Sequence, residues 1–190
     1  MKKCYLFILG LLIMITFTAC KGGTALPQSS TSKVNTVPLI DPPKILITSE
    51  DKEIHYVIGL NQWNGSIYDR EDTFQTIMKK DSGIEVTYIK LGETIQIQFI
   101  GTAPDKLQLE DCILKEDGMP KYTEKEVNEI PVKLTNGKLT FKLDAHMAAM
   151  LSSNSKDYEP GNTIRGFRLI CNWDNNECEY GFVIRTDAKQ

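Results

Sequence analysis

The feature that most constrains the fold is a two-residue alternation of apolar and polar side chains, which recurs from Lys44 almost to the C-terminus. Successive side chains of a strand point to opposite faces, so this period is typical of strands with one buried face. No long stretch shows the helical period of about 3.6 residues, which argues against a parallel α/β sheet. The alternating segments are residues 54–60, 84–88, 95–99, 107–114, 130–143, 167–173 and 178–184.

Turn residues separate these segments, and helical signals are few. Asn64-Gly65 and Asn136-Gly137 favour two-residue hairpin loops of type I′, because both central residues of that turn need positive φ. Residues 72–75 form a capping box before a short apolar run, and Asp144 is placed to cap a second short helix over residues 146–151. The sequence thus predicts an all-β protein, an antiparallel β-sandwich with two short helices.

Two of the strand segments carry further detail. With Asn136-Gly137 as the loop, the apolar residues of 130–143 fall on one face of a hairpin, and its lysines and threonines fall on the other. In residues 107–114, Asp111 falls in phase with the apolar side chains instead of among the polar ones. We expect either a bulge or a strand buried on both faces there.

The C-terminal hairpin predicts a cysteine pair. Its two apolar faces meet only if the loop has two residues, either Asp174-Asn175 or Asn175-Asn176. Cys171 then lies opposite Cys178 or one diagonal step away, which fits a short cross-strand disulfide. We predict this disulfide, with Cys112 left as a free thiol. The alternative is a reduced pair of buried thiols.

The N-terminus predicts a removable signal peptide, residues 1–19. Lys2-Lys3 supplies a positive charge, and residues 5–17 form an apolar stretch shorter than the roughly 20 residues that span a bilayer. Thr18-Ala19 then precedes Cys20. This arrangement resembles the signal of bacterial lipoproteins, in which the cysteine receives a diacylglyceryl group. The resemblance implies lipidation of Cys20 and a location on the extracytoplasmic face of the cell membrane; the alternative is an ordinary secretory signal with Cys20 merely nearby.

Composition separates a tether from a globular domain. Residues 20–43 are rich in Gly, Ser, Thr and Pro and poor in large apolar residues, which predicts a flexible, lipid-anchored tether. Residues 44–190 hold the alternating segments and form the expected β-sandwich domain. The chain has 22 Lys+Arg against 25 Asp+Glu and a net charge of −3. This balance lacks the basic face of a nucleic-acid-binding protein, so no nucleic-acid partner is expected.

Three stretches carry a resemblance over most of the predicted domain. They are residues 59–63 (Gly-Leu-Asn-Gln-Trp), 91–93 (Leu-Gly-Glu) and 178–184 (Cys-Glu-Tyr-Gly-Phe-Val-Ile). In this pattern the chain resembles uncharacterised lipoproteins of Gram-positive bacteria with an immunoglobulin-like extracytoplasmic domain. It is also similar to the C-terminal domain of M56-type antirepressor sensors. The resemblance implies an immunoglobulin-like sandwich, whereas the peptidase half and its His-Glu-x-x-His helix are absent from the sequence.

The residues that could carry catalysis are scattered. His55 and His146 lack the spacing of a zinc site, so no metal and no cofactor are predicted. Cys112 with His146 is an imaginable nucleophile and base, but a cysteine in an apolar strand is more commonly an inert buried thiol. No nucleophile elbow or glycine-rich phosphate loop is present. We therefore assign no catalytic residue and expect a protein that is not an enzyme.

One surface patch is a candidate for ligand binding. Trp63, Tyr68, Asp69 and Arg70 gather around the first predicted hairpin and could recognise a peptide or glycan. An aromatic cross-strand pair and an acidic helix start explain the same residues without a ligand. We expect a noncatalytic binding or sensing module that contacts an extracytoplasmic protein or an envelope ligand. The alternative is an envelope-associated hydrolase acting on wall or peptide substrates.

Overall fold

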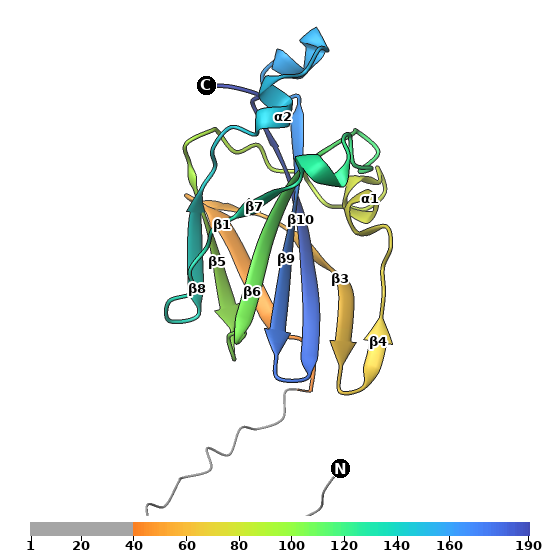
Figure 1. The fold of residues 1–190 in the computed structure, drawn as a ribbon, viewed down its shortest axis with the longest axis vertical. Helices are drawn as coiled ribbons and strands as arrows, with labels where there is room; N and C mark the ends of the chain where they lie inside the picture. The colour runs from red at the N-terminus through yellow and green to blue at the C-terminus, as the bar shows by residue number, and fades with distance from the viewer. Residues whose placement is uncertain (1–39) are drawn as a thin grey trace, which may run out of the picture. The chain divides into compact units, whose positions relative to one another are not determined.

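The computed structural model describes residues 40–190. The predicted signal peptide, the predicted lipidation site Cys20 and most of the predicted tether lie outside these residues. The described part is a β-sandwich of two antiparallel sheets with two short helices, which confirms the predicted fold class (Figure 1). Within residues 40–190, no helix combines the length and the apolar character needed to cross a membrane.

The two sheets differ in size. The smaller sheet has the order β2-β1-β5-β8, and the larger sheet has the order β4-β3-β10-β9-β6-β7. The strands of the smaller sheet are β1 (Lys44–Ser49), β2 (Lys52–Glu53), β5 (Thr94–Ile100) and β8 (Lys138–Lys142). Those of the larger sheet are β3 (Tyr56–Trp63), β4 (Ser66–Tyr68), β6 (Lys106–Leu114), β7 (Asn128–Ile130), β9 (Thr163–Trp173) and β10 (Asn176–Thr186). The helices are α1 (Thr73–Met78) and α2 (Met147–Met150), with 3-10 turns η1 (Glu124–Glu126) and η2 (Ser155–Tyr158).

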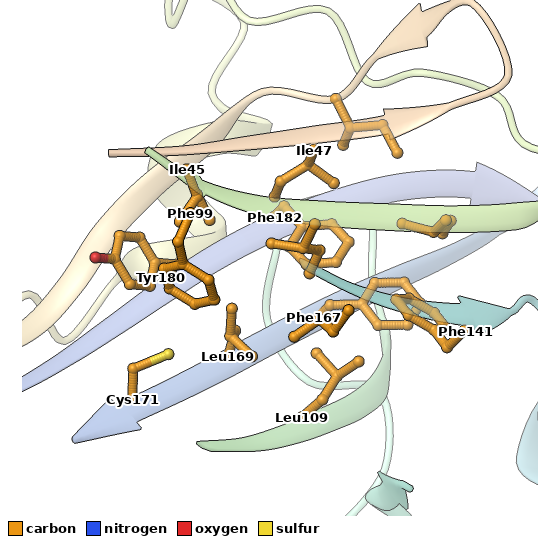
Figure 2. Close-up of a cluster of buried hydrophobic side chains, with 14 of the residues drawn as sticks. Ile45, Ile47, Phe99, Leu109, Phe141, Phe167, Leu169, Cys171, Tyr180 and Phe182 are labelled. Carbon is orange, nitrogen blue, oxygen red and sulfur yellow. The ribbon is translucent and has the colours of Figure 1, made fainter. Parts of the chain in front are cut away.

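The core lies between the sheets and is centred on β9 and β10. Figure 2 shows side chains from both sheets meeting there. The rings of Phe167 and Phe182 are stacked, with 4.8 Å between their centroids. Tyr180 is fully buried, and its hydroxyl donates a hydrogen bond to the backbone oxygen of Pro43 at 2.6 Å. The C-terminal hairpin has the loop Asp174-Asn175, one of the two predicted registers. The predicted inward residues are all buried: Phe167, Leu169, Cys171, Trp173, Cys178, Tyr180, Phe182 and Ile184.

A bulge in β3 changes which side chains face the core. Between Ile58 and Asn61, two residues of β3 stand opposite the single residue Glu179 of β10. Such an insertion shifts the alternation by one residue. Tyr56 and Ile58 therefore pack against the core before the bulge, and Trp63 is buried in the core after it.

The predicted hairpin over residues 130–143 is only partly correct. Its loop, Asn136-Gly137, has the positive φ angles of 53° and 73° that were expected. However, Ile130 ends β7, which pairs with β6 in the larger sheet, while β8 pairs with β5 in the smaller sheet. Residues 131–134 thus carry the chain from one sheet to the other, beginning at Pro131, which has no N–H to donate to a ladder. Residues 84–88, also predicted as a strand, lie outside the regular strands.

Candidate functional site

Helix α1 packs closely on the outer face of the larger sheet because glycines lie beneath it. A Cβ atom at Gly181 would lie 2.4 Å from Cγ2 of Thr73. One at Gly166 would lie 3.0 Å from Cζ of Phe74. A side chain at either position would push the helix away from the strands. The helix and sheet share a second small core that consists of Phe74, Ile77, Leu114, Ile164 and Val183.

Beside α1, two hollows on this outer face share Phe74, Pro120 and Arg168, and we call them together the outer groove. The first hollow has a volume of about 410 Å³ and a mainly apolar surface, and the second has about 280 Å³ and a more polar surface. The first falls within the range of roughly 300–1,000 Å³ that is usual for ligand pockets. Its other lining residues are Glu110, Cys112, Ile113, Tyr122, Thr123, Glu124, Glu126, Val127 and Gly166. Those of the second are Leu60, Asp69, Arg70, Glu71, Asp72, Thr73, Gln75, Gly118 and Glu179.

The outer groove carries a strong excess of negative charge. Seven carboxylates line it against two guanidinium groups, those of Arg70 and Arg168. Among residues 40–190, four of the seven make no ion pair; the other three, Asp72, Glu110 and Glu179, pair with Lys79 or Arg168. The four carboxylates without an ion pair are Asp69, Glu71, Glu124 and Glu126.

Arg168 lies where the two hollows meet, and its contacts are loose. Its Nη1 is 3.6 Å from Oε2 of Glu110 and its Nε is 3.4 Å from Oε2 of Glu179. Its guanidinium carbon lies 5.8 Å from the ring centroid of Phe74, within cation–π range. The side chain is 43% exposed, so solvent screens both ion pairs. Burial raises the pKa of Glu179, because the second hollow removes part of the hydration of its carboxylate.

A second acid–arginine group lies on the opposite face of β6 and β9, between the sheets. This inner cluster consists of Asp111, Arg165 and His146, all buried. Arg165 donates two hydrogen bonds to the Asp111 carboxylate, the one from Nε at 3.0 Å, and Nη1 donates to the backbone oxygen of Asp144 at 2.6 Å. The buried Asp111 accounts for the interruption in the alternation of β6, which pairs with β9 without a bulge.

His146 joins the inner cluster to helix α2. Its Nδ1 accepts a hydrogen bond from the backbone N–H of Ala148 at 3.2 Å, so His146 caps the helix in place of the predicted Asp144. Its Nε2 lies 4.0 Å from Oδ2 of Asp111 and makes no hydrogen bond within the described residues. Burial lowers the pKa of His146, because the charged imidazolium would lose its hydration there.

The structure does not bring Cys112 and His146 together as a catalytic pair. Asp111 and Cys112 are neighbours on β6 and point to opposite faces, with His146 beside Asp111 and Cys112 in the outer groove. The Cys112 thiol lies 3.4 Å from the backbone oxygen of Gly166, to which it donates a hydrogen bond. Burial raises its pKa to about 12, so little reactive thiolate forms at neutral pH.

The predicted Cys171 to Cys178 disulfide is absent: both residues are buried free thiols, and Cys112 is free as well. Cys171 and Cys178 are direct cross-strand partners, two steps from the loop-flanking pair Trp173 and Asn176. Pairs at that spacing are of the hydrogen-bonded type, whose Cβ atoms stand about 4.5–5.5 Å apart, wider than the roughly 3.5–4.5 Å of a disulfide. Burial raises the pKa of both thiols, that of Cys178 to about 12.

The predicted patch of Trp63, Tyr68, Asp69 and Arg70 is divided by the structure. Trp63 is a core residue, only 5% exposed, and its ring packs edge-on against Trp173 at 5.2 Å, so its assignment to a surface patch was wrong. The bulge in β3 is the cause, because it turns Trp63 inward. Tyr68 is exposed, and its hydroxyl accepts hydrogen bonds from Arg70 at 2.9 and 3.2 Å. Asp69 and Arg70 line the second hollow of the outer groove.

No local sequence pattern singled out the residues at the centre of the outer groove. Glu110, Arg168 and Glu179 sit at ordinary outward positions of their strands, where charged side chains are expected. The signal available in the sequence was the phase of Asp111, which marks its neighbour Glu110 as outward-facing. Nothing in the sequence indicated that α1 and residues 115–127 would border the same region on the outer face of the larger sheet.

Other features of the described residues point to no further centre. No group of three or more His, Cys, Asp or Glu in residues 40–190 is placed to hold a metal ion. His55 is exposed on the surface. Comparison of the chain with protein-family models finds no match, and comparison with curated proteins finds none either.

Proposed function

We propose that this protein is a noncatalytic binding or sensing module and that the outer groove is its binding site. One observation carries the proposal: a hollow of ligand size with a mainly apolar surface is bordered by carboxylates that have no ion-pair partner within residues 40–190. A surface that only stabilised the fold would gain little from holding such groups together. A ligand with complementary charge and an apolar part would gain from both features.

The cellular setting belongs to the same proposal. Residues 1–19 direct export, Cys20 carries a lipid, and residues 20–43 hold the sandwich domain on the extracytoplasmic face of the cell membrane of a Gram-positive bacterium. The resemblance to lipoproteins with an immunoglobulin-like domain supports this setting. Cys20→Ala should abolish the acyl modification and either release the protein from membranes into the medium or leave it unprocessed. A variant that stays in the membrane fraction with the acyl mass retained would refute the lipid anchor.

The alternative function, an envelope-associated hydrolase, draws on one observation. Glu179 lies in a hollow, and burial raises its pKa, as in carboxyl groups that act as general acids. The nearest groups to it favour a binding role instead, because Arg168 occupies the space between Glu179 and Glu110. Glu179→Gln tests the alternative: a hydrolase that uses this carboxyl group would lose its turnover of wall or peptide substrates, and a turnover that survives in the folded variant would refute that role.

The binding site is tested with a pair of charge-matched variants. Glu124→Lys with Glu126→Lys reverses two exposed carboxylates on the rim of the groove. Asp51→Lys with Glu85→Lys makes the same change in net charge at exposed positions outside it. Each full-length variant is used to capture ligands from an envelope extract, and the ligands are identified by mass spectrometry. A ligand retained by the wild type and the control but lost from the groove variant supports the proposal, and equal retention by all three refutes it.

A further inference from the structure

We infer that the outer groove binds an extended segment of a partner protein in which arginine or lysine side chains alternate with apolar ones. This inference rests on the proposed function and specifies its ligand. Three properties of the groove support it: the apolar surface of the first hollow, the distribution of charge around it and the loose contacts of Arg168.

The first hollow requires an apolar group from the ligand. Ile113, Tyr122 and Val127 contribute apolar surface to its lining, and Phe74 lines both this hollow and the second one. Its volume of about 410 Å³ exceeds what a single small ion needs. Filling it with a branched aliphatic side chain removes apolar surface from water, which favours binding. A hydrophilic cation alone would leave this surface exposed.

The charge around the hollow requires a cation. Glu124 and Glu126 lie on its rim without an ion-pair partner within the described residues, and Glu110 faces it from β6. The second hollow, which shares Phe74 with the first, adds Asp69 and three further carboxylates. Two acidic regions therefore flank one apolar region. A chain with cationic side chains on both sides of an apolar one matches this order.

Arg168 leaves Glu110 and Glu179 able to accept further hydrogen bonds. Its distances to Glu110 and Glu179, 3.6 and 3.4 Å, are longer than those of well-formed charge-assisted hydrogen bonds. Its Nε has no hydrogen-bond partner within residues 40–190. Both carboxylates therefore keep oxygen atoms that can accept hydrogen bonds from a ligand. A guanidinium group suits this position because its planar fork binds carboxylates with two parallel hydrogen bonds.

Other ligand classes match fewer of these properties. The carboxylates repel nucleic acids and anionic membranes, whose phosphates need basic surfaces. A polyamine supplies charge but no side chain for the first hollow. A peptide supplies both, and its backbone adds hydrogen bonds along the groove.

The test uses a fluorescein-labelled peptide of alternating arginine and valine as the probe, with the full-length protein in detergent and fluorescence anisotropy as the readout. A second probe carries citrulline in place of arginine, which keeps the shape and removes the charge. A third carries serine in place of valine. We expect each substitution to weaken binding roughly tenfold or more, the factor that corresponds to about 1.4 kcal/mol. The Glu124→Lys, Glu126→Lys variant should weaken binding of the first probe similarly, and the Asp51→Lys, Glu85→Lys control should not.

The outcomes separate this inference from the proposed function. The inference would be overturned if the protein bound the arginine and citrulline probes with equal affinity. If the groove variant weakened the binding of both, the groove would still be a binding site. Displacement of the first probe by spermidine at equal concentration, or tighter binding of anionic vesicles, would overturn the inference in favour of those ligands. If the groove variant binds every probe and every captured ligand as tightly as the wild type does, the proposed function itself is overturned.

Discussion

Strands β6 and β9 carry two acid–arginine groups of opposite character on their two faces. The inner cluster pairs Asp111 with Arg165, which are 1% and 3% exposed, and satisfies the guanidinium with a carboxylate and a backbone carbonyl. The outer groove pairs Glu110 with Arg168, whose side chain is 43% exposed, at 3.6 Å. The acids are sequence neighbours, and both arginines come from β9.

The comparison shows that location and geometry, not residue type, decide what an ion pair does. Removing one partner of a buried, hydrogen-bonded pair leaves an uncompensated charge and costs about 3–5 kcal/mol, whereas an exposed pair contributes about 0–1 kcal/mol. The inner pair thus cannot lose one partner without a large cost in stability. The outer pair adds little stability, and its carboxylates remain available to a ligand.

The largest expected effect comes from breaking the inner pair. Asp111→Ala leaves Arg165 buried without its carboxylate, so urea unfolding should show a loss of about 3–5 kcal/mol. The double variant Asp111→Leu, Arg165→Met removes both charges and should recover most of that loss. A loss below about 1 kcal/mol for Asp111→Ala would place the inner pair in the same class as the exposed one.

A smaller loss of stability is expected from a change that pushes α1 away from the larger sheet, which forms the floor of the outer groove. In Gly181→Ala the new Cβ would lie 2.4 Å from Cγ2 of Thr73, so overpacking should cost about 1–3 kcal/mol in urea unfolding. Adding Thr73→Ser removes the clashing methyl group and keeps the hydroxyl that donates to the Arg70 carbonyl. The double variant should therefore be more stable than Gly181→Ala alone, and an equal or lower stability would contradict this packing.

The two regions also differ in the sign of their pH dependence. Burial lowers the pKa of His146, so on acidification the unfolded chain binds this proton at a higher pH than the folded protein does. The free energy of unfolding should therefore fall as the pH drops below about 6.5. Burial raises the pKa of Glu179, so as the pH rises the unfolded chain releases this proton at a lower pH than the folded protein does. This group should therefore lower the free energy of unfolding as the pH rises above about 4.5. His146→Asn keeps a capping side chain and should flatten the first slope, while Glu179→Gln should flatten the second. An unchanged profile in either variant would show that the slope arises elsewhere.

The smallest effect is expected from the outer pair. Glu110→Gln removes a charge that lies 3.6 Å from the half-exposed Arg168, so the free energy of unfolding should change by less than about 1 kcal/mol. The change should shrink further in high salt. A loss comparable to that of Asp111→Ala would remove the distinction between the two faces.

Local patterns predicted the parts of the fold that depend on short-range sequence, namely single strands and the hairpins β3–β4 and β9–β10. The alternation placed Phe167 and Tyr180 on one buried face, and the Asn136-Gly137 turn formed as expected. The bulge that turns Trp63 inward was not predictable, because it depends on the pairing of β3 with the distant strand β10. The same is true of Arg165 as the partner of Asp111. The outer groove needs α1, residues 115–127 and four strands together, so no local pattern could reveal it.

The central claim, that the outer groove and not the inner cluster binds the ligand, is tested most directly by hydrogen–deuterium exchange of the full-length protein with and without the arginine–valine probe. Bound probe should slow exchange in residues 70–78, 108–114 and 120–127, which line or support the groove. Residues 144–151, which contain His146 and α2, should exchange as before. Protection confined to residues 144–151 or to β4 (Ser66–Tyr68), with none along the groove, would contradict the claim.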